Sequence, residues 1–254
     1  MSSETPVYVV TGGAGGLGGA TARRLARRGA TVVVTDIVDV DESTVLTEYG
    51  VRAVFVRGDV CSEADVTRVL DVAAERGSIR ALVHCPGKGL PRRIVDRAGV
   101  PFPLEDFEAA VRLNLIGTFN CVRLVAARMA TNHPVDGERG TIVMTASVAA
   151  WDGQIGQVAY AAAKAGVVGM TLCAARDLSD LGIRVNTIAP GIFDTPLLAR
   201  LDDGIRATLA ASVTFPKRLG EPEEYAILAE QMLDNHYLNG EVVRLDGAIR
   251  MAAR

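Results

Sequence analysis

Tyr160 and Lys164, a tyrosine and a lysine four residues apart, have a clear chemical use. In a helix this spacing places both side chains on one face, one turn apart. A free tyrosine has a pKa of about 10, and a neighbouring ammonium group favours the phenolate, which brings the hydroxyl closer to acid–base use at neutral pH. The pair alone is commonplace, so its meaning depends on the residues around it.

Two further polar residues supply that context. Ser147 ends the apolar run TIVMTAS and can donate a hydrogen bond to a substrate oxygen held near Tyr160. Asn114 lies in a long helical pattern, where asparagine is a slightly poor helix former, and it either holds a water in a proton relay or is a surface or capping residue. Tyr160 would then protonate a carbonyl oxygen during reduction, or take the hydroxyl proton during oxidation.

A glycine-rich stretch, TGGAGGLG at 11–18, lies between an apolar run and a helical pattern. This order is typical of dinucleotide binding, because glycines let the backbone approach a pyrophosphate whose charge is favoured at a helix N-terminus. Asp36 follows at the spacing of a carboxylate that binds adenosine ribose hydroxyls and repels a 2′-phosphate. Neither the loop nor Ile37-Val38 supplies a basic residue, so the sequence predicts NAD rather than NADP. Asp59, which ends the next apolar run, either holds the adenine amino group or caps the following helix.

These residues must be positioned by alternating strands and helices. Short β-branched runs are expected at 6–11, 30–36, 52–60, 79–85, 141–147, 183–190 and 241–246. Helical patterns are expected at 18–28, 63–75, 104–130, 157–181 and 221–233. The alternation predicts a doubly wound, three-layer α/β (Rossmann) fold with a mostly parallel sheet of about seven strands, as one domain over 1–254. The stretches 86–103 and 191–216 are expected to be long loops of functional use.

Composition narrows the classes of partner. Hydrophobic residues make up 49% and aromatics 5%, as expected for strands covered on both faces, and the net charge of −3 argues against nucleic acid or an anionic membrane. Arg92, Arg93 and Arg97 are the local exception, and they either meet an anionic ligand or lie in a solvated loop. The four cysteines are scattered, which predicts neither disulfides nor a zinc site and fits a reducing compartment. The start, MSSETPVYVV, lacks leader features, so a soluble, cytoplasmic protein is expected.

The motifs together resemble the classical short-chain dehydrogenase/reductase family. They are TGGAGGLG, Asp59-Val60, Asn114, Ser147, Tyr160-x-x-x-Lys164 and Pro190-Gly191. The resemblance covers nearly the whole chain and implies a Rossmann fold with hydride exchange at the nicotinamide C4. It also implies a catalytic tetrad of Asn114, Ser147, Tyr160 and Lys164, in which Lys164 binds the nicotinamide ribose as well. No metal is implied.

A narrower resemblance, to the type-2 3-hydroxyacyl-CoA dehydrogenase subgroup, rests on longer runs. These include TASVAAWDGQIGQVAYAAAKAGVVGMTL, IRVNTIAPGIFDTPLL and the tail FPKRLGEPEEYA with LNGEVVRLDGAIRM. It implies NAD-dependent interconversion of 3-hydroxyacyl-CoA and 3-oxoacyl-CoA, of the kind used in fatty acid oxidation, by a homotetramer with small-molecule substrates. The implied NAD site comprises Gly12, Gly15, Gly16, Leu17, Gly18, Asp36, Asp59, Val60, Cys85, Gly87, Tyr160, Lys164, Pro190, Phe193 and Thr195, and the implied substrate contacts are Ser147, Gln157 and Tyr160. The alternatives are a hydroxysteroid or general carbonyl substrate, and a non-catalytic NAD-binding scaffold subunit.

One segment departs from the family pattern. His84-Cys85-Pro86-Gly87 stands where Asn-Asn-Ala-Gly or Asn-Cys-Ala-Gly is usual. Pro86 removes a backbone N–H, so any contact that an amide makes there is lost. His84 is expected to replace the asparagine amide as a hydrogen-bonded structural residue rather than as a pH-active group.

Overall fold

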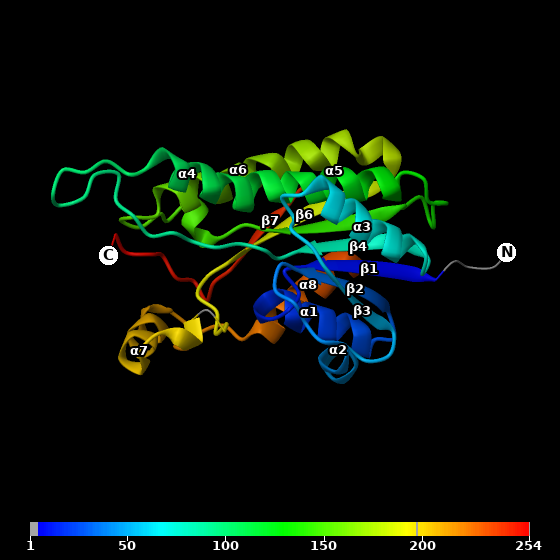
Figure 1. Cartoon of the computed structure of the whole chain (residues 1–254), viewed down its shortest axis with the longest axis horizontal. Coiled ribbons are helices and arrows are strands. Elements are labelled where there is room, and N and C mark those ends of the chain that lie inside the picture. Colours follow the sequence, from blue (N-terminus) through cyan, green and yellow to red (C-terminus); the bar gives the residue numbers. More distant parts are fainter. Residues whose placement is uncertain (1–4, 197, 254) are drawn as a thin grey trace.

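Seven parallel strands form one sheet at the centre of the computed structural model, which describes residues 5–196 and 198–253 (Figure 1). Their order across the sheet is β3-β2-β1-β4-β5-β6-β7. The strands are β1 (Pro6–Thr11), β2 (Thr31–Asp36), β3 (Ala53–Arg57), β4 (Ser78–His84), β5 (Gly140–Thr145), β6 (Ile183–Pro190) and β7 (Val242–Leu245). The predicted doubly wound fold is confirmed. Residues 1–4, on which the expectation about a leader rests, lie outside the described residues.

Helices cover both faces of this sheet (Figure 1). One layer contains α3 (Glu63–Ala74), α4 (Leu104–Val111), α5 (Gly117–Met129) and α6 (Val158–Asp177). The opposite layer contains α1 (Gly16–Arg27), α2 (Glu42–Tyr49) and α8 (Pro222–Asp234), and α7 (Asp203–Ser212) lies to one side. Short 3-10 turns occupy η2 (Val148–Ala150), η3 (Ser179–Leu181) and η4 (Leu198–Arg200), and a π-helical turn, η1 (Arg112–Ile116), joins α4 to α5.

The strands are apolar along their length because both faces are covered. In β2, Val33 packs with residues of α3 and α5, whereas Val32 and Val34 pack with residues of α1 and α8. Alternate side chains therefore enter different cores, and β5 and β6 are buried at every residue. This explains why the sequence shows continuous β-branched runs rather than polar alternation.

Two helices were not predicted. The start of α2 is fixed by the Asp41 carboxylate, which accepts a hydrogen bond from the Thr44 backbone N–H, and the start of α7 by Asp202, which accepts from Gly204. The prediction that 191–216 is a loop was therefore wrong in part, because α7 occupies Asp203–Ser212, although none of its residues is buried. The stretch 86–103 has no helix or strand, as predicted, and carries only an isolated bridge between Val95 and Pro101.

Two helical stretches are long and apolar enough to cross a bilayer by length and composition. They are Leu104–Met129 and Val158–Asp177, with mean hydropathies of 1.2 and 1.5. Both belong to the layer that packs on the sheet, and 50% and 39% of their apolar windows are buried there. Core helices of soluble proteins meet the same criterion, so the feature is weak evidence for a membrane span.

Candidate active site

The strand order reverses between β1 and β4, which places a crevice at the carboxyl ends of these strands. The glycine-rich loop after β1 lies at this crevice. Gly12 has a φ of +66°, and a Cβ there would lie 2.8 Å from the Pro86 backbone nitrogen, while a Cβ at Gly18 would lie 2.2 Å from the Gly12 carbonyl oxygen. The loop therefore has no room for side chains at these positions, and the backbone itself forms the surface of the crevice.

Helix α1 begins inside this loop and fits an anionic group at its N-terminus. Its N-cap, Gly15, provides no side-chain hydrogen bond, and its first turn holds no acidic residue. The uncapped N–H groups and the helix dipole are the features that favour a phosphate. The cradle thus fits the pyrophosphate of a dinucleotide, with Gly12, Gly15, Gly16, Leu17 and Gly18 in it.

Asp36, the last residue of β2, adjoins the loop. Its carboxylate accepts hydrogen bonds from the backbone N–H groups of Ala14, at 3.1 Å, and Val38, at 3.3 Å. It is half-buried, which leaves part of the carboxylate open to a ligand at the edge of the sheet. This is the place that a ribose-binding carboxylate takes in a dinucleotide site.

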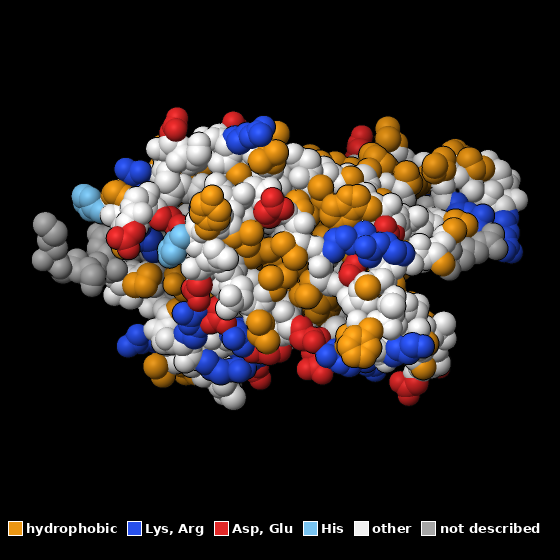
Figure 2. All heavy atoms as spheres, turned by 180° about the vertical axis from the view of Figure 1, so that it is seen from behind, with side chains coloured by type: hydrophobic (Ala, Val, Ile, Leu, Met, Phe, Trp, Pro, Cys, Tyr) orange, Lys and Arg blue, Asp and Glu red, His pale blue; other side chains and the backbone are white. Residues whose placement is uncertain are grey.

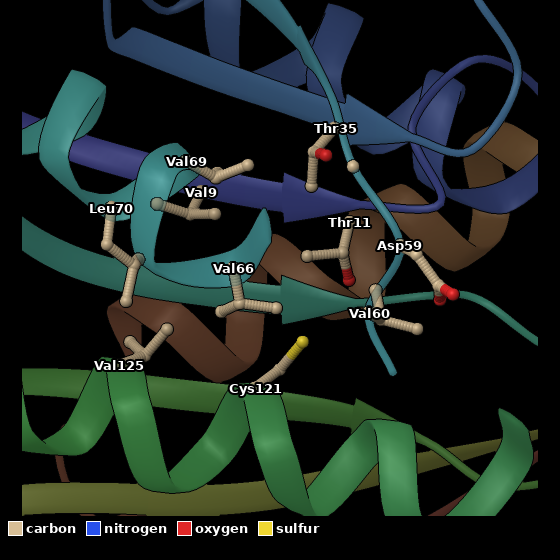
Figure 3. Close-up of a pocket in the computed structure, with 11 residues that line it drawn as sticks. Val9, Thr11, Thr35, Asp59, Val60, Val66, Val69, Leu70, Cys121 and Val125 are labelled. Carbon is tan, nitrogen blue, oxygen red and sulfur yellow. The ribbon is translucent and has the colours of Figure 1, made fainter. Parts of the chain in front are cut away.

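Asp59 and Val60 lie beyond the strand ends (Figure 3). In Figure 3, Asp59 points away from the small apolar cavity lined by Val66 and Val69. The Asp59 carboxylate accepts from the Cys61 backbone N–H at 2.9 Å. Ser62, not Asp59, caps α3. The alternative that Asp59 is the helix cap is therefore wrong, and its carboxylate faces a groove.

That groove, of about 390 Å³, contains basic residues that sequence reasoning missed. Arg57 and Arg68 line it with Ile37 and Asp59, and the Arg57 side chain donates a hydrogen bond of 3.1 Å to the Ile37 carbonyl. The glycine loop and the two residues after Asp36, on which the prediction of NAD depends, contain neither of these arginines. Since Asp36 and Arg57 are partners in the β2–β3 register, strand pairing was the signal that would have found Arg57.

Ser147, Tyr160 and Lys164 meet at the same edge of the sheet. Ser147 follows β5, and α6 carries the other two residues. The Lys164 Nζ lies 5.8 Å from the centre of the Tyr160 ring and donates a hydrogen bond of 2.7 Å to the Thr145 carbonyl oxygen. The structure therefore brings together the three residues that the sequence singled out.

The pKa shifts differ from the expectation for this pair. Burial raises the pKa of Tyr160 above its usual value, and a hydrogen bond with the Ser147 hydroxyl acts in the opposite direction. Burial lowers the pKa of Lys164 to about 8. The expectation that the lysine brings the tyrosine pKa toward neutral is not met, because both side chains lose solvent and each charged form is disfavoured. Tyr160 is thus protonated at neutral pH.

Asn114 is fully buried in the π-helical turn, which excludes both the surface and the capping interpretation. Its side-chain amide donates to the Lys88 carbonyl, at 3.0 Å, and its Oδ1 accepts from the Lys88 backbone N–H, at 3.2 Å. Gly87 lies between two of the predicted catalytic groups, because a Cβ there would be 3.0 Å from the Asn114 Oδ1 and 3.2 Å from the Lys164 Nζ. Asn114 therefore anchors the start of the loop beside the lysine.

His84 is fully buried and hydrogen-bonded on both ring nitrogens. Nδ1 lies 2.8 Å from the Thr11 hydroxyl and Nε2 lies 3.1 Å from the Thr118 hydroxyl. Burial, with the charge of Lys164 acting in the same direction, lowers its pKa to about 3. The expectation of a structural, neutral histidine agrees with this geometry. Its neighbour Cys85 is half-buried, and burial raises the pKa of its thiol to about 11.

The remaining predicted residues lie on loops over the crevice. Pro190 ends β6, and Phe193 is buried beside Gly220. Thr195 lies over the glycine loop, because a Cβ at Gly16 would be 3.6 Å from its side chain. Gln157 stands at the start of α6, where its side-chain amide bonds with that of Gln154 at 3.2 Å, about one turn from Tyr160.

Comparison with known proteins agrees with this arrangement. A family model described as short chain dehydrogenase matches residues 6–206. The chain belongs to the short-chain dehydrogenase family. It is an oxidoreductase. It is 52% identical to 3-hydroxyacyl-CoA dehydrogenase type-2 of Drosophila melanogaster over 98% of both chains, and 49% identical to the Homo sapiens protein of that name over 96% of this chain and 95% of the other. A solved structure of 3-hydroxyacyl-CoA dehydrogenase type-2 from Mycobacterium avium has a TM-score of 0.95, at 48% identity, and covers 98% of this chain and 97% of its own.

This short-chain dehydrogenase has the groups that reduction of a ketone requires. A dinucleotide bound in the glycine cradle would supply or accept the hydride. Tyr160 is placed to move the proton, and Ser147 is placed to hold the oxygen by a hydrogen bond. Across the described residues, no cluster of three histidine, cysteine or acidic side chains has the arrangement of a metal site.

Proposed function

We propose that this short-chain dehydrogenase interconverts 3-hydroxyacyl-CoA and 3-oxoacyl-CoA with NAD as its cofactor, a reaction of fatty acid oxidation. The observation that carries the proposal is sequence identity of about 50%, over nearly the whole chain, to proteins named for that reaction. The similarity spans the catalytic residues and also the loops that cover them.

In the direction of reduction, the ketone carbon gains a hydride and the oxygen gains a proton. The Tyr160 hydroxyl donates that proton, since burial keeps it protonated at neutral pH. Ser147 donates a hydrogen bond to the same oxygen. The Lys164 ammonium lies close enough to stabilise the phenolate that remains, and Asn114 holds the neighbouring loop in place.

The preference for NAD rests on Asp36, whose carboxylate repels a 2′-phosphate. In the adjoining groove Arg68 pairs with Asp65 at 2.7 Å, so only Arg57 is left to offset part of this repulsion, and NADP is expected to bind more weakly than NAD.

Assembly as a homotetramer is supported by apolar side chains that remain exposed on the outer helices. Phe119 of α5 is 52% exposed, Ile116 of η1 is 49% exposed and Leu172 of α6 is 46% exposed. Burying such groups against a second copy would be favourable. We expect light scattering on purified protein to give four times the mass of the chain.

Free thiols at all four cysteines fit a cytoplasmic, reducing location, away from nucleic acid and membranes, and cell fractionation tests this.

The experiment that tests the activity is the loss of NADH absorbance with acetoacetyl-CoA and a chain-length series of 3-oxoacyl-CoA, with NADPH assayed side by side. We expect turnover with NADH that is lost by at least about 100-fold in Tyr160→Phe, while NADH binding is retained. If the protein turned over a hydroxysteroid but no 3-oxoacyl-CoA, the proposed substrate class would be contradicted, whereas the proposed catalytic residues would not.

A further inference from the structure

A groove of about 420 Å³ lies between the loop that follows β4 and the segment that leads into α6. Arg92 and Arg93 line it from the loop, and Gln154 and Gln157 line it from the opposite segment. No acidic residue is among its lining residues in the described part of the chain. The groove is therefore cationic, in a protein whose net charge is −3.

The groove adjoins the catalytic centre. The loop starts at Gly87, beside the Lys164 Nζ, and passes Tyr160, because a Cβ at Gly89 would lie 4.0 Å from the Tyr160 ring. The Arg92 backbone N–H then donates a hydrogen bond of 2.8 Å to the Gly156 carbonyl. Arg92 is thus fixed next to the residue that precedes Gln157, at the opening of the centre toward solvent.

The two arginines differ in how their charges are used. The Arg92 guanidinium is 2.8 Å from the Asp106 carboxylate and lies over the Phe102 ring, 6.0 Å from its centre. Arg93 has no ion pair or side-chain hydrogen bond with any described residue, so its charge is available to a ligand. In Figure 2, basic side chains gather at the end of the molecule where this loop projects.

The other wall of the groove is held by the end of the chain. The Gln154 side chain donates to the Ala252 carbonyl at 3.0 Å, and the Ile155 backbone N–H donates to the Ala253 carbonyl at 3.0 Å. Gln154 and Gln157 also bond to each other. These contacts give the groove two polar amides in fixed positions, opposite the arginines.

We propose that this groove binds the phosphate groups of the coenzyme A moiety, with Arg93 as the principal ligand. The inference rests on the proposed function. When the reacting carbonyl is at Tyr160, the pantetheine arm must carry the phosphates away from the centre, and the loop from Gly87 to Arg93 leads outward from that point. A guanidinium group matches a phosphate in geometry and can bind it through two parallel hydrogen bonds.

The test compares two thioesters of the same acyl group, acetoacetyl-CoA and acetoacetyl-N-acetylcysteamine, which lacks the phosphates. We expect Arg93→Ala to raise KM for acetoacetyl-CoA about fivefold with kcat nearly unchanged, and to leave KM for the truncated thioester unaltered. Arg93→Lys should restore part of the loss. Arg97→Ala is the matched control, because Arg97 is an exposed arginine of the same loop that does not line the groove.

Equal effects of Arg93→Ala on both thioesters, or equal effects of Arg93→Ala and Arg97→Ala, would overturn the proposal. Failure of the proposed function is a separate result, in which the wild-type protein binds NADH but reduces neither thioester. In that case, calorimetric titration with adenosine 3′,5′-bisphosphate tests whether the groove binds phosphate groups. Tighter binding by the wild-type protein than by Arg93→Ala supports a phosphate site, and equal binding overturns it.

Discussion

The ammonium group of Lys164 donates a hydrogen bond to the carbonyl oxygen of Thr145 at the end of β5, over a distance of 2.7 Å. The lysine is 1% exposed and has no carboxylate partner among the described residues. A single neutral acceptor offsets only part of the desolvation of the charge, which is why the pKa of Lys164 falls to about 8.

This shift predicts the pH dependence of ketone reduction. Reduction requires the protonated Tyr160 hydroxyl and the Lys164 ammonium, and the pKa of Lys164 is about 8, so kcat/KM is expected to be constant below that pH and to fall above it. Initial rates measured from about pH 6 to about pH 10 test this. Lys164→Met should be much slower and should lack the break near pH 8. The same break in Lys164→Met would assign it to another group.

Cofactor choice should change when the charge at the end of β2 is removed. Asp36→Asn keeps the size of the side chain but loses the repulsion of a 2′-phosphate, so we expect NADPH to bind about tenfold more tightly than it does to the wild-type protein. NADH should bind more weakly. Fluorescence titration of each reduced cofactor measures both changes. Adding Arg57→Ala to Asp36→Asn should reverse the gain for NADPH, and an unchanged gain would show that Arg57 does not face the phosphate.

Acid stability should depend on His84. The pKa of this buried residue is about 3 in the folded protein, below its usual 6.5. As the pH falls below 6.5, His84 therefore becomes protonated in the unfolded chain but stays neutral in the folded protein, which favours unfolding. Between about pH 7.5 and about pH 5, wild type should lose about 2 kcal/mol of unfolding free energy that His84→Asn does not lose. Urea unfolding at both pH values measures the difference. His133→Asn, at an exposed histidine, is the matched control and should keep the wild-type slope.

A buried arginine near the start of β6, at the end of the sheet opposite the candidate site, should be critical for stability. Arg184 is 7% exposed in its side chain, contacts both oxygens of Glu138 at 2.7 and 3.2 Å, and donates to backbone carbonyls near the end of α8. Arg184→Leu removes this donor from the backbone carbonyls of Met232 and Leu233 and leaves Glu138 with only the exposed His236 as a side-chain partner, so it should lower the free energy of unfolding by about 3–5 kcal/mol. Arg76→Leu, at a more exposed arginine, should change it by less than about 0.5 kcal/mol. Similar losses in chemical denaturation of the two variants would contradict this account.

Much of the architecture was predictable because both sides of the sheet are covered. Strands such as β6 are buried throughout and so appear as uninterrupted apolar runs, and the edges of α3 agree with the prediction to within one residue. Helix α7 was missed although two local signals were present, the cap at Asp202 and the four-residue spacing of Ile205 and Leu209; none of its residues is buried in the core. Helix α1 begins two residues earlier than expected, since Gly16 belongs to both the loop and the helix.

The candidate site was predictable in its residues but not in its electrostatics. The four-residue spacing placed Tyr160 and Lys164 on one helical face. The direction in which the Tyr160 pKa shifts depends on how deeply both side chains are buried, and sequence spacing gives no information about burial. The hydrogen-bond partners of His84 could likewise not be predicted from the sequence, because Thr11 and Thr118 belong to different elements. Arg57 was detectable only through the pairing of β2 with β3.

The π-helical turn between α4 and α5 contains one residue more than a regular helix of the same rise needs. Such a bulge is what remains when a single residue is inserted into an existing α-helix without disturbing the packing on either side. The extra residue turns Asn114 out of the regular spiral toward Lys88. Deleting one residue there would restore an unbroken helix, leave both flanking segments packed on the sheet, and withdraw the Asn114 amide from the backbone of Lys88.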